Sequence, residues 1–204
     1  MSPSAGGGTP LVLGKITAEQ IDETFNTNVK GTIFTVQQAL PLTGKGGSII
    51  LTGSSAGTTG VPGYTAGSAS KAAVRNLARI WAEDLKGTGI RGNVLSPGAT
   101  AAELTKEALG EEGQKAYGAM TPLQRMADPA EIGAVAAFLA SDDSSFMTAS
   151  EVAVDGGLAL IACSNNLCPQ GLPDPCYQLV TEPSSRRRRG GRYTRTAPGS
   201  ASFH

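Results

Sequence analysis

Short apolar runs alternate with longer segments of helical periodicity along the first 160 residues of the chain. The apolar runs have the length of buried strands and cover 48–52, 90–95 and 151–154. The periodic segments repeat apolar residues every three or four positions and cover 19–40, 65–86, 103–117 and 129–140. This alternation favours an α/β fold in which right-handed crossovers join parallel strands.

Two of the predicted helices carry clear start signals. Thr17 is an expected N-cap, and Gln20 three positions later would complete a capping box. Asp128 is a second expected N-cap, with Pro129 at the first helical position and Glu131 at the third. Both signals predict helices that begin where the periodicity begins.

The periodic pattern stops at about residue 161, so we expect a 1–160 domain followed by a 161–204 tail. The tail is rich in Pro, Gly, Ser and Arg without any period, which predicts disorder. Its six Arg and two acidic residues give it a charge of +4, which leaves −4 on residues 1–160 of a neutral chain. The four arginines at 186–189 suit nucleic acid or a nuclear import receptor. No aromatic platform accompanies them, so we expect an accidental extension rather than a nucleic-acid partner.

Composition narrows the class of protein further. The chain has 204 residues, 40% of them hydrophobic, which is enough for one domain with a core. No apolar run approaches the ~20 residues of a membrane helix, and the start lacks a signal peptide, so a cytoplasmic protein is the default. No metal is expected, because Cys163, Cys168 and Cys176 lack a fourth ligand and a neighbouring His.

The Gly-rich stretch after the first predicted strand imitates two known sites. Gly53-Ser54-Ser55-Ala56-Gly57 matches the nucleophile elbow of α/β-hydrolases, but the only histidine is His204, and Val61-Pro62-Gly63 delays the helix. The same glycines imitate a nucleotide-binding turn, yet the next acidic residue, Glu83, follows Gly53 by thirty positions instead of about twenty. We therefore interpret the stretch as a turn that leaves a strand.

Five motifs occur in an order that points to one enzyme family. Ser54, residue 67 and Lys71 have the spacing of a catalytic serine, tyrosine and lysine. Asn28, in the sequence Asn-Val-Lys-Gly, has the place of an asparagine that acts from a helix. The other three motifs are Ile-Arg-Gly-Asn-x-x-x-Pro-Gly at 90–98, Asp155-Gly156-Gly157, and Ser4-Ala5-Gly6 in place of Asn-Ala-Gly. Over residues 4 to 160 this order resembles the short-chain dehydrogenase/reductase family. The resemblance implies a three-layer, Rossmann-like, doubly wound parallel sheet.

The resemblance also implies roles for single residues. Hydride would pass between NAD or NADP and a small-molecule alcohol or carbonyl, with Ser54 bonded to the substrate oxygen and Asn28 holding a water molecule. Lys71 would hold the nicotinamide ribose and lower the pKa of a tyrosine phenol one turn away. Three further residues, Pro97, Gly98 and Thr100, would lie against the cofactor.

The expected tyrosine position is occupied by Gly67, which has no group that could donate a proton. Tyr64 is an alternative phenol, but it lies about 10 Å from Lys71 along a helix, against about 6 Å for residue 67. We expect Tyr64 to form a wall of the substrate pocket.

The chain departs from the family pattern in two other respects. The Gly-rich turn that binds pyrophosphate in the family is not found in the sequence, so we expect an N-terminally truncated domain, weak cofactor binding and an exposed apolar edge at 48–52. Gly92 stands where the family usually has Val. The missing side chain should lower the free energy of unfolding by about 2–4 kcal/mol.

Together these departures predict an oxidoreductase that has lost activity. The alternative is a non-catalytic partner that forms homo- or hetero-oligomers through helices 19–40 and 65–86, as the resemblance implies. Neither the substrate nor the choice between NAD and NADP can be inferred.

Overall fold

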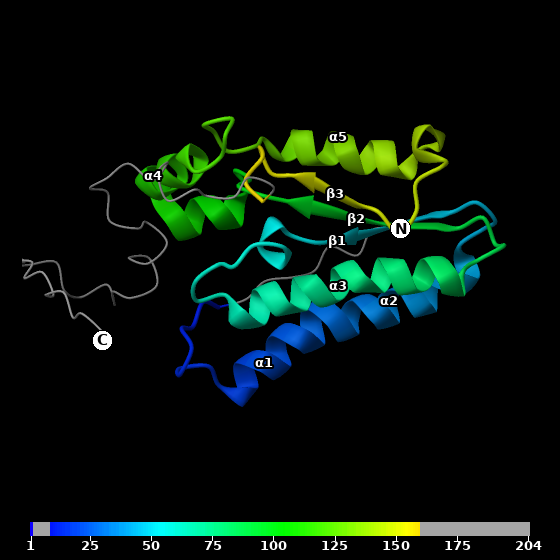
Figure 1. Cartoon of the computed structure of the whole chain (residues 1–204), viewed down its shortest axis with the longest axis horizontal. Helices are drawn as coiled ribbons and strands as arrows, with labels where there is room; N and C mark the ends of the chain where they lie inside the picture. Colours follow the sequence, from blue (N-terminus) through cyan, green and yellow to red (C-terminus); the bar gives the residue numbers. More distant parts are fainter. Residues whose placement is uncertain (2–8, 160–204) are drawn as a thin grey trace, which may run out of the picture.

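A computed structural model describes residue 1 and residues 9–159 and contains a parallel sheet between helical layers (Figure 1). The strands are β1 (Ser48–Thr52), β2 (Arg91–Pro97) and β3 (Glu151–Val154), in the order β1-β2-β3. One face of the sheet carries α1 (Ala18–Phe25), α2 (Gly31–Ala39) and α3 (Thr65–Asp84), and the other carries α5 (Pro129–Ala140). The predicted α/β fold with parallel strands is confirmed.

The remaining elements are short or lie at the ends of the sheet. Helix α4 (Glu103–Ala119) lies beyond the carboxyl ends of the strands, and Gly110 interrupts it with a φ of 62°. A π-helical segment (Asn26–Lys30) joins α1 to α2, and 3-10 turns cover Leu40–Leu42, Ser55–Gly57 and Asp142–Ser144. The predicted single helix 19–40 is therefore wrong in detail, because an extra residue widens one turn at Asn28.

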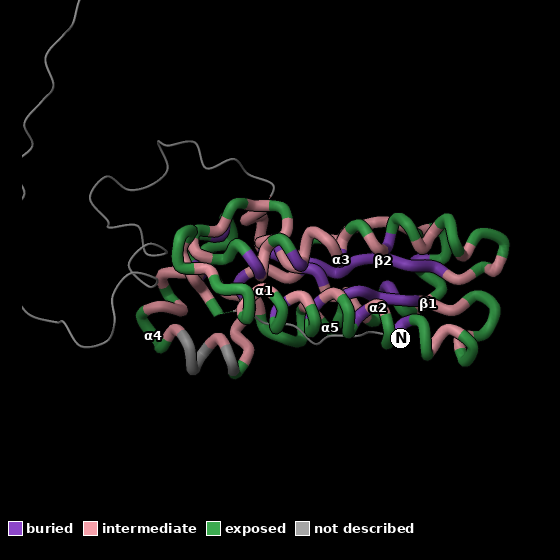
Figure 2. The backbone as a smooth tube through the Cα atoms, turned by 90° about the horizontal axis from the view of Figure 1, so that it is seen from below, coloured by how far each residue is buried: buried purple, intermediate pink, exposed green. Residues whose placement is uncertain are grey.

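The sheet is the most buried part of the described chain (Figure 2). Alternate side chains of β1 point to opposite faces, so Ile49 and Leu51 pack toward α3 while Ile50 packs toward α5. The core on the α3 side consists of Val36, Ile49, Leu51, Val74, Ala78 and Val94, and that on the α5 side of Ile50, Leu95 and Leu139.

The expectation of an exposed apolar edge at 48–52 is wrong for the side chains. Ile49, Ile50 and Leu51 are 0%, 4% and 0% exposed, because helices cover both faces of β1. The backbone at the free edge of β1 also forms hydrogen bonds with Met1. The Met1 ammonium donates to the Ser48 carbonyl over 2.8 Å, and the Ile50 N–H donates to the Met1 carbonyl over 2.9 Å.

The second strand extends further than its apolar run predicts, since β2 continues to Pro97. The last hydrogen bond between β1 and β2 runs from the Gly53 N–H to the Leu95 carbonyl over 2.8 Å. Pro97 lies beyond that point and pairs with Val154 of β3, where the Gly98 N–H supplies the hydrogen bond, so the missing N–H of Pro97 breaks neither of these bonds.

The start of β2 is fixed to the end of α5 by a buried arginine. Arg91 is 9% exposed, and its guanidinium donates to the Leu139 and Ser141 carbonyls over 3.3 and 3.0 Å. It also donates to the Ser144 hydroxyl over 2.8 Å. A cation at the carbonyl end of a helix interacts favourably with the helix dipole, which explains how this charge is tolerated in the core.

The two predicted N-caps differ in the structure. The Asp128 side chain accepts from the Ala130 N–H, and Glu131 accepts from the Asp128 N–H, so this capping box is complete. Thr17 accepts from the Gln20 N–H over 3.2 Å. The Gln20 side chain bonds to the Thr9 carbonyl instead of returning to Thr17, so the first capping box is only half formed.

Candidate functional site

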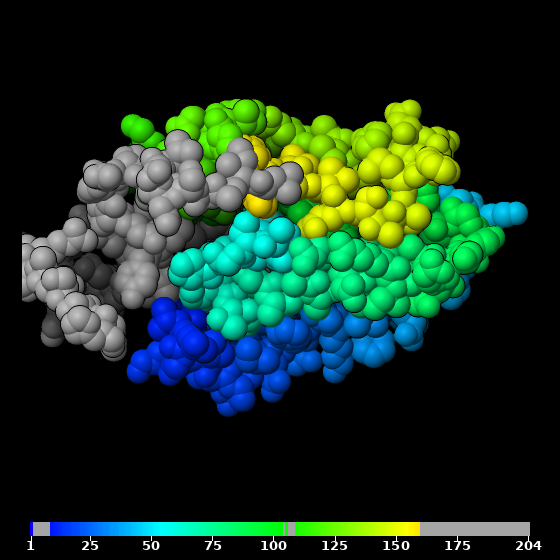
Figure 3. Space-filling model, in the orientation of Figure 1, coloured from blue at the N-terminus to red at the C-terminus, as the bar shows by residue number. Residues whose placement is uncertain are grey.

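The turn after β1 is shaped by two close backbone approaches. A Cβ on Gly53 would lie 2.2 Å from the Ser96 Oγ, and a Cβ on Gly57 would lie 3.1 Å from the backbone carbon of Lys71. Packing against β2 therefore leaves no room for a side chain at Gly53, and packing against α3 leaves little room at Gly57. Close packing accounts for these glycines without a hydrolase elbow or a nucleotide-binding turn. Figure 3 shows this cyan segment at the surface between α3 and the yellow end of β3.

Ser54 occupies the start of this turn in an extended conformation. Its hydroxyl accepts a hydrogen bond from the Ala56 N–H over 3.2 Å. The neighbouring Ser55, the nucleophile of the hydrolase alternative, is only 5% exposed and opens a 3-10 turn rather than a long helix. The geometry of the turn therefore does not support a hydrolase elbow.

Lys71 points from α3 to the carboxyl end of β1. Its ammonium donates to the Thr52 carbonyl over 2.8 Å, two residues before Ser54. Burial lowers the pKa of this lysine, because the charged form loses hydration. The lysine is thus held at the same end of β1 as the serine, as the sequence predicts.

Gly67 and Tyr64 share the first turn of α3. Tyr64 is the N-cap residue, and its carbonyl accepts the Ser68 N–H over 2.8 Å. A Cβ built on Gly67 would meet only the Tyr64 Cδ1 among the described neighbours, at an ordinary contact distance of 3.6 Å. The position where the family pattern expects a tyrosine is therefore sterically open beyond the Tyr64 ring.

A buried polar chain connects Asn28 to the backbone of Gly67. The Asn28 amide donates to the Ser70 hydroxyl over 2.9 Å, and Ser70 donates to the Gly67 carbonyl over 2.7 Å. Asn28 and Ser70 are 1% and 0% exposed. The π-helical turn therefore carries Asn28 against α3 at the level of residue 67, and Ser70 is a member of the cluster that the sequence analysis missed.

The other proposed cofactor residues lie at the carboxyl end of β2, the neighbour of β1, or just after it. The Gly98 N–H donates to the Val154 carbonyl over 3.0 Å, and a Cβ on Gly98 would lie 2.4 Å from the Asp155 Cβ. The Thr100 hydroxyl donates to the Gly98 carbonyl over 3.1 Å. Because parallel strands end at the same edge of a sheet, Pro97, Gly98 and Thr100 lie at the same edge as the turn that carries Ser54.

A second polar cluster holds the turn from its outer side. Arg75 donates to the Thr58 hydroxyl over 2.9 Å and lies 3.7 Å from a carboxylate oxygen of Glu151. The other oxygen of Glu151 accepts from the Ser96 hydroxyl over 2.7 Å. Arg75 could have been noted from its place one turn after Lys71, but no local signal identifies Glu151.

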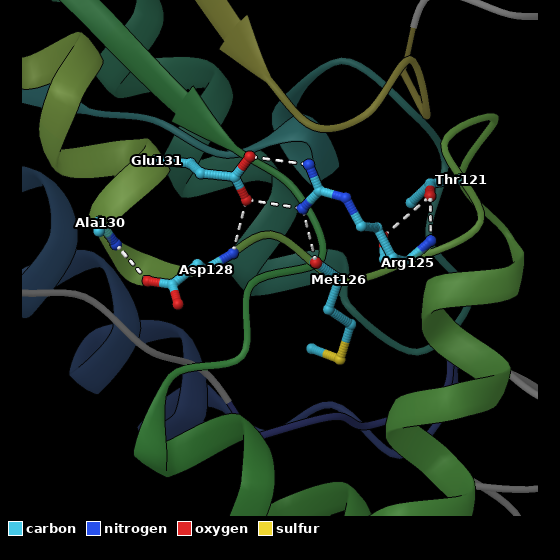
Figure 4. A network of polar contacts seen from close by, with 6 residues as sticks. All are labelled: Thr121, Arg125, Met126, Asp128, Ala130 and Glu131. Carbon is cyan, nitrogen blue, oxygen red and sulfur yellow. Dashed lines mark hydrogen bonds and ion pairs between the residues drawn. The ribbon is translucent and has the colours of Figure 1, made fainter.

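Figure 4 shows a third network, at the start of α5. Arg125 forms a two-pronged ion pair with Glu131, with N–O distances of 2.6 and 2.8 Å. The hydrogen bonds from Arg125 and from the Asp128 N–H lower the pKa of Glu131 to about 2. An adjoining cavity of about 70 Å³ is far smaller than the roughly 300–1,000 Å³ of a ligand pocket, so this network fastens a helix rather than holding a substrate.

The described residues contain neither a metal cluster nor a membrane-spanning helix. No group of three or more His, Cys, Asp or Glu side chains lies close enough to hold a metal ion there. In the same part of the chain, no helix is long and apolar enough to cross a membrane. The cysteines and His204 lie outside the described residues, as does the whole 161–204 tail.

Comparison with known proteins identifies the family. A family model described as Enoyl-(Acyl carrier protein) reductase matches residues 4–159. The chain belongs to the short-chain dehydrogenase/reductase family. Oxidoreductase asL5 of Sarocladium schorii is 64% identical over 160 residues, which are 78% of this chain and 64% of that protein. The 3-oxoacyl-(acyl-carrier-protein) reductase FabG of Thermotoga maritima is 35% identical over 77% of this chain and 64% of its own length.

A solved structure of the family extends the comparison to three dimensions. The angucycline C-6 ketoreductase LanV with bound NADP has a TM-score of 0.73 and 28% identity, covering 78% of this chain and 62% of that one. The predicted Rossmann-like short-chain dehydrogenase/reductase fold is thereby confirmed for the described part. The chain spans less than two thirds of the length of these relatives.

Proposed function

We propose that the chain carries the proton-relay side of a short-chain dehydrogenase/reductase site for an alcohol or carbonyl substrate, and that Gly67 arrests it at proton transfer. The observation that carries this proposal is the arrangement around residue 67. Lys71 is held at the end of β1, and Asn28 reaches the Gly67 carbonyl through Ser70. A proton relay is thus assembled around a position without a side chain.

The proposed roles follow from the donors and acceptors that these residues offer. Lys71 supplies ammonium protons for the ribose hydroxyls of a nicotinamide nucleotide, and Asn28 binds a water molecule behind the lysine. Ser54 offers a hydroxyl to the substrate oxygen, and Tyr64 forms an aromatic wall of the pocket. General acid catalysis is typically worth 10²–10⁴-fold, so loss of the donor alone would leave a very slow enzyme.

The residues present fit the nicotinamide end of NAD or NADP, whose bound form would exchange the hydride. Lys71 is a half-buried cationic donor at the carboxyl end of β1, where parallel sheets bind ligands. Pro97, Gly98 and Thr100 would lie against that group. The absence of a side chain at Gly98 is explained by the close approach of Asp155 and needs no cofactor.

The test compares the chain with Gly67→Tyr and its matched control Gly67→Phe. NADPH binding is measured by fluorescence up to millimolar concentration, and the reduction of a carbonyl compound that carries no phenol is measured by absorbance. We expect saturable weak binding, very slow turnover by the parent chain, and turnover by Gly67→Tyr that exceeds that of the parent chain and of Gly67→Phe by about 10²–10⁴-fold. Turnover by the parent chain as fast as that by Gly67→Tyr, no turnover by either variant with NADPH bound, or no saturable binding would each contradict the proposal.

The second candidate function is association through the surface of α2 and α3. An open groove on α2 is lined by Phe34, Thr35, Gln38, Ala39 and Leu42. Phe34 and Leu42 are 49% and 86% exposed, and Ile80 of α3 is 48% exposed. We propose that the exposed apolar side chains Phe34, Leu42 and Ile80 bind a second copy or an intact relative. Exposed apolar surface often marks an interface.

Light scattering of the purified chain tests this association. Phe34→Asp should reduce the measured mass to that of a monomer. Phe146→Asp, which alters an equally apolar and fully exposed side chain outside the groove, should leave the mass unchanged. A parent chain that stays monomeric at micromolar concentration, both alone and mixed with an intact relative, would refute the proposal.

A further inference from the structure

Gly67 differs from the other glycines of the site because packing does not require it. A Cβ on Gly53, Gly57 or Gly98 would come within 3.1 Å of neighbouring atoms, whereas on Gly67 it would touch only the Tyr64 ring at 3.6 Å. Gly67 is also partly exposed, so this position can be reached from solvent. The space beside residue 67 is therefore open to a ligand.

The groups around this space have a defined chemistry. The aromatic ring of Tyr64 borders it on one side. Lys71 lies one helical turn further along α3, and its ammonium has three donors, of which the Thr52 carbonyl takes one. An aromatic wall beside a fixed cationic donor suits a flat ring that bears an acidic hydroxyl.

We propose that the space beside Gly67 binds the phenol ring of a small-molecule ligand, with its oxygen accepting a hydrogen bond from Lys71. The inference rests on the proposed function, because it assigns the substrate class as phenolic carbonyl compounds. In that reaction, with reduced NAD(P) as the hydride source, the phenol O–H gives its proton to the carbonyl oxygen. It becomes a phenolate beside Lys71, and water returns the proton.

Burial of the Lys71 ammonium supports this pairing. Its lowered pKa reflects lost hydration, and a phenolate at hydrogen-bond distance would stabilise the charged form. The lysine should in turn lower the pKa of the bound phenol. A chromogenic phenol therefore reports occupation of the site by a rise in its phenolate absorbance.

The experiment titrates 4-nitrophenol with the full chain, without nicotinamide cofactor, at a pH near the pKa of the probe. We expect a saturable rise in phenolate absorbance with the parent chain. Gly67→Tyr should abolish the rise by filling the space, and Lys71→Met should weaken binding about tenfold, the loss of one charge-assisted hydrogen bond. Gly133→Tyr is the matched control, since a Cβ at that α5 position meets nothing within 4 Å.

A measurement on the parent chain keeps the test valid if a variant fails to fold. Amide NMR shifts on addition of 4-nitrophenol should concentrate at residues 64–71, and nitrobenzene, which lacks the hydroxyl, should produce them more weakly. No saturable rise, an equal rise with Gly67→Tyr, or shifts concentrated elsewhere would overturn the phenol site. Because the assay needs no cofactor and no turnover, such a failure would leave the proposed oxidoreductase function to its own test.

Discussion

Gly92 lies in the buried strand β2 opposite Ile49, and the structure has room for a side chain there. A Cβ on Gly92 would meet only the Ala78 carbonyl oxygen, at 3.9 Å. In Gly92→Ala, lower backbone freedom in the unfolded chain contributes about 0.5–1 kcal/mol, and one buried methyl about 0.8 kcal/mol. We therefore expect stabilisation of about 1.5 kcal/mol, or a Tm about 3–6 °C higher for a domain of this size.

The assay is thermal and urea unfolding of the purified chain, and the controls are the same substitution at other glycines. Gly98→Ala places a Cβ 2.4 Å from the Asp155 Cβ, and Gly53→Ala places one 2.2 Å from the Ser96 Oγ. Overpacking of this kind should destabilise by about 1–3 kcal/mol. A lower midpoint for Gly92→Ala, or neutral effects at Gly98 and Gly53, would refute the reasoning.

Three further outcomes are expected from unfolding experiments. Asp128→Ala removes the N-cap of α5 and should lower the free energy of unfolding by about 1 kcal/mol; an unchanged urea midpoint would contradict the cap. The hydrogen bond from Arg125 lowers the folded-state pKa of Glu131 from 4.5 to about 2, so its stabilisation is complete above pH 4.5 and is lost as the pH falls toward 2. In Glu131→Gln the urea midpoint of unfolding should fall less as the pH is lowered from 4.5 toward 2. An equal fall in the parent chain and the variant would disprove the role of the ion pair. Ala149 has a φ of 57°, so Ala149→Gly should relieve about 1 kcal/mol of strain and raise the Tm.

The sequence predicted the elements well where the signal is local. Strands 48–52 and 151–154 coincide with β1 and β3, and the Asp128 capping box forms as predicted. The π-helical turn at Asn28 was not predicted, because its widened hydrogen bonding leaves the apolar spacing almost unchanged. Met1 likewise gave no sign that it would pair with β1.

Of the site, the sequence predicted the residues that belong to the serine–tyrosine–lysine motif and missed others. The spacing of Ser54, residue 67 and Lys71 identifies the three positions, since a helix places residues four apart on one face. Ser70 and Glu151 were missed because their partners are distant in sequence. The hydrogen bond from Asn28 to Ser70 spans 42 positions, and that from Ser96 to Glu151 spans 55.

By itself the sequence determined the family, the order of the elements and the absence of a phenol at Gly67, because these depend on residue identity and local periodicity. Only the tertiary structure decided which glycine positions have room for a side chain. Gly53, Gly57 and Gly98 lack side chains because neighbouring segments occupy the space, whereas Gly67 faces space that its neighbours leave open. The physical reason is that steric room depends on segments brought together by folding, and no local pattern records which segments those will be.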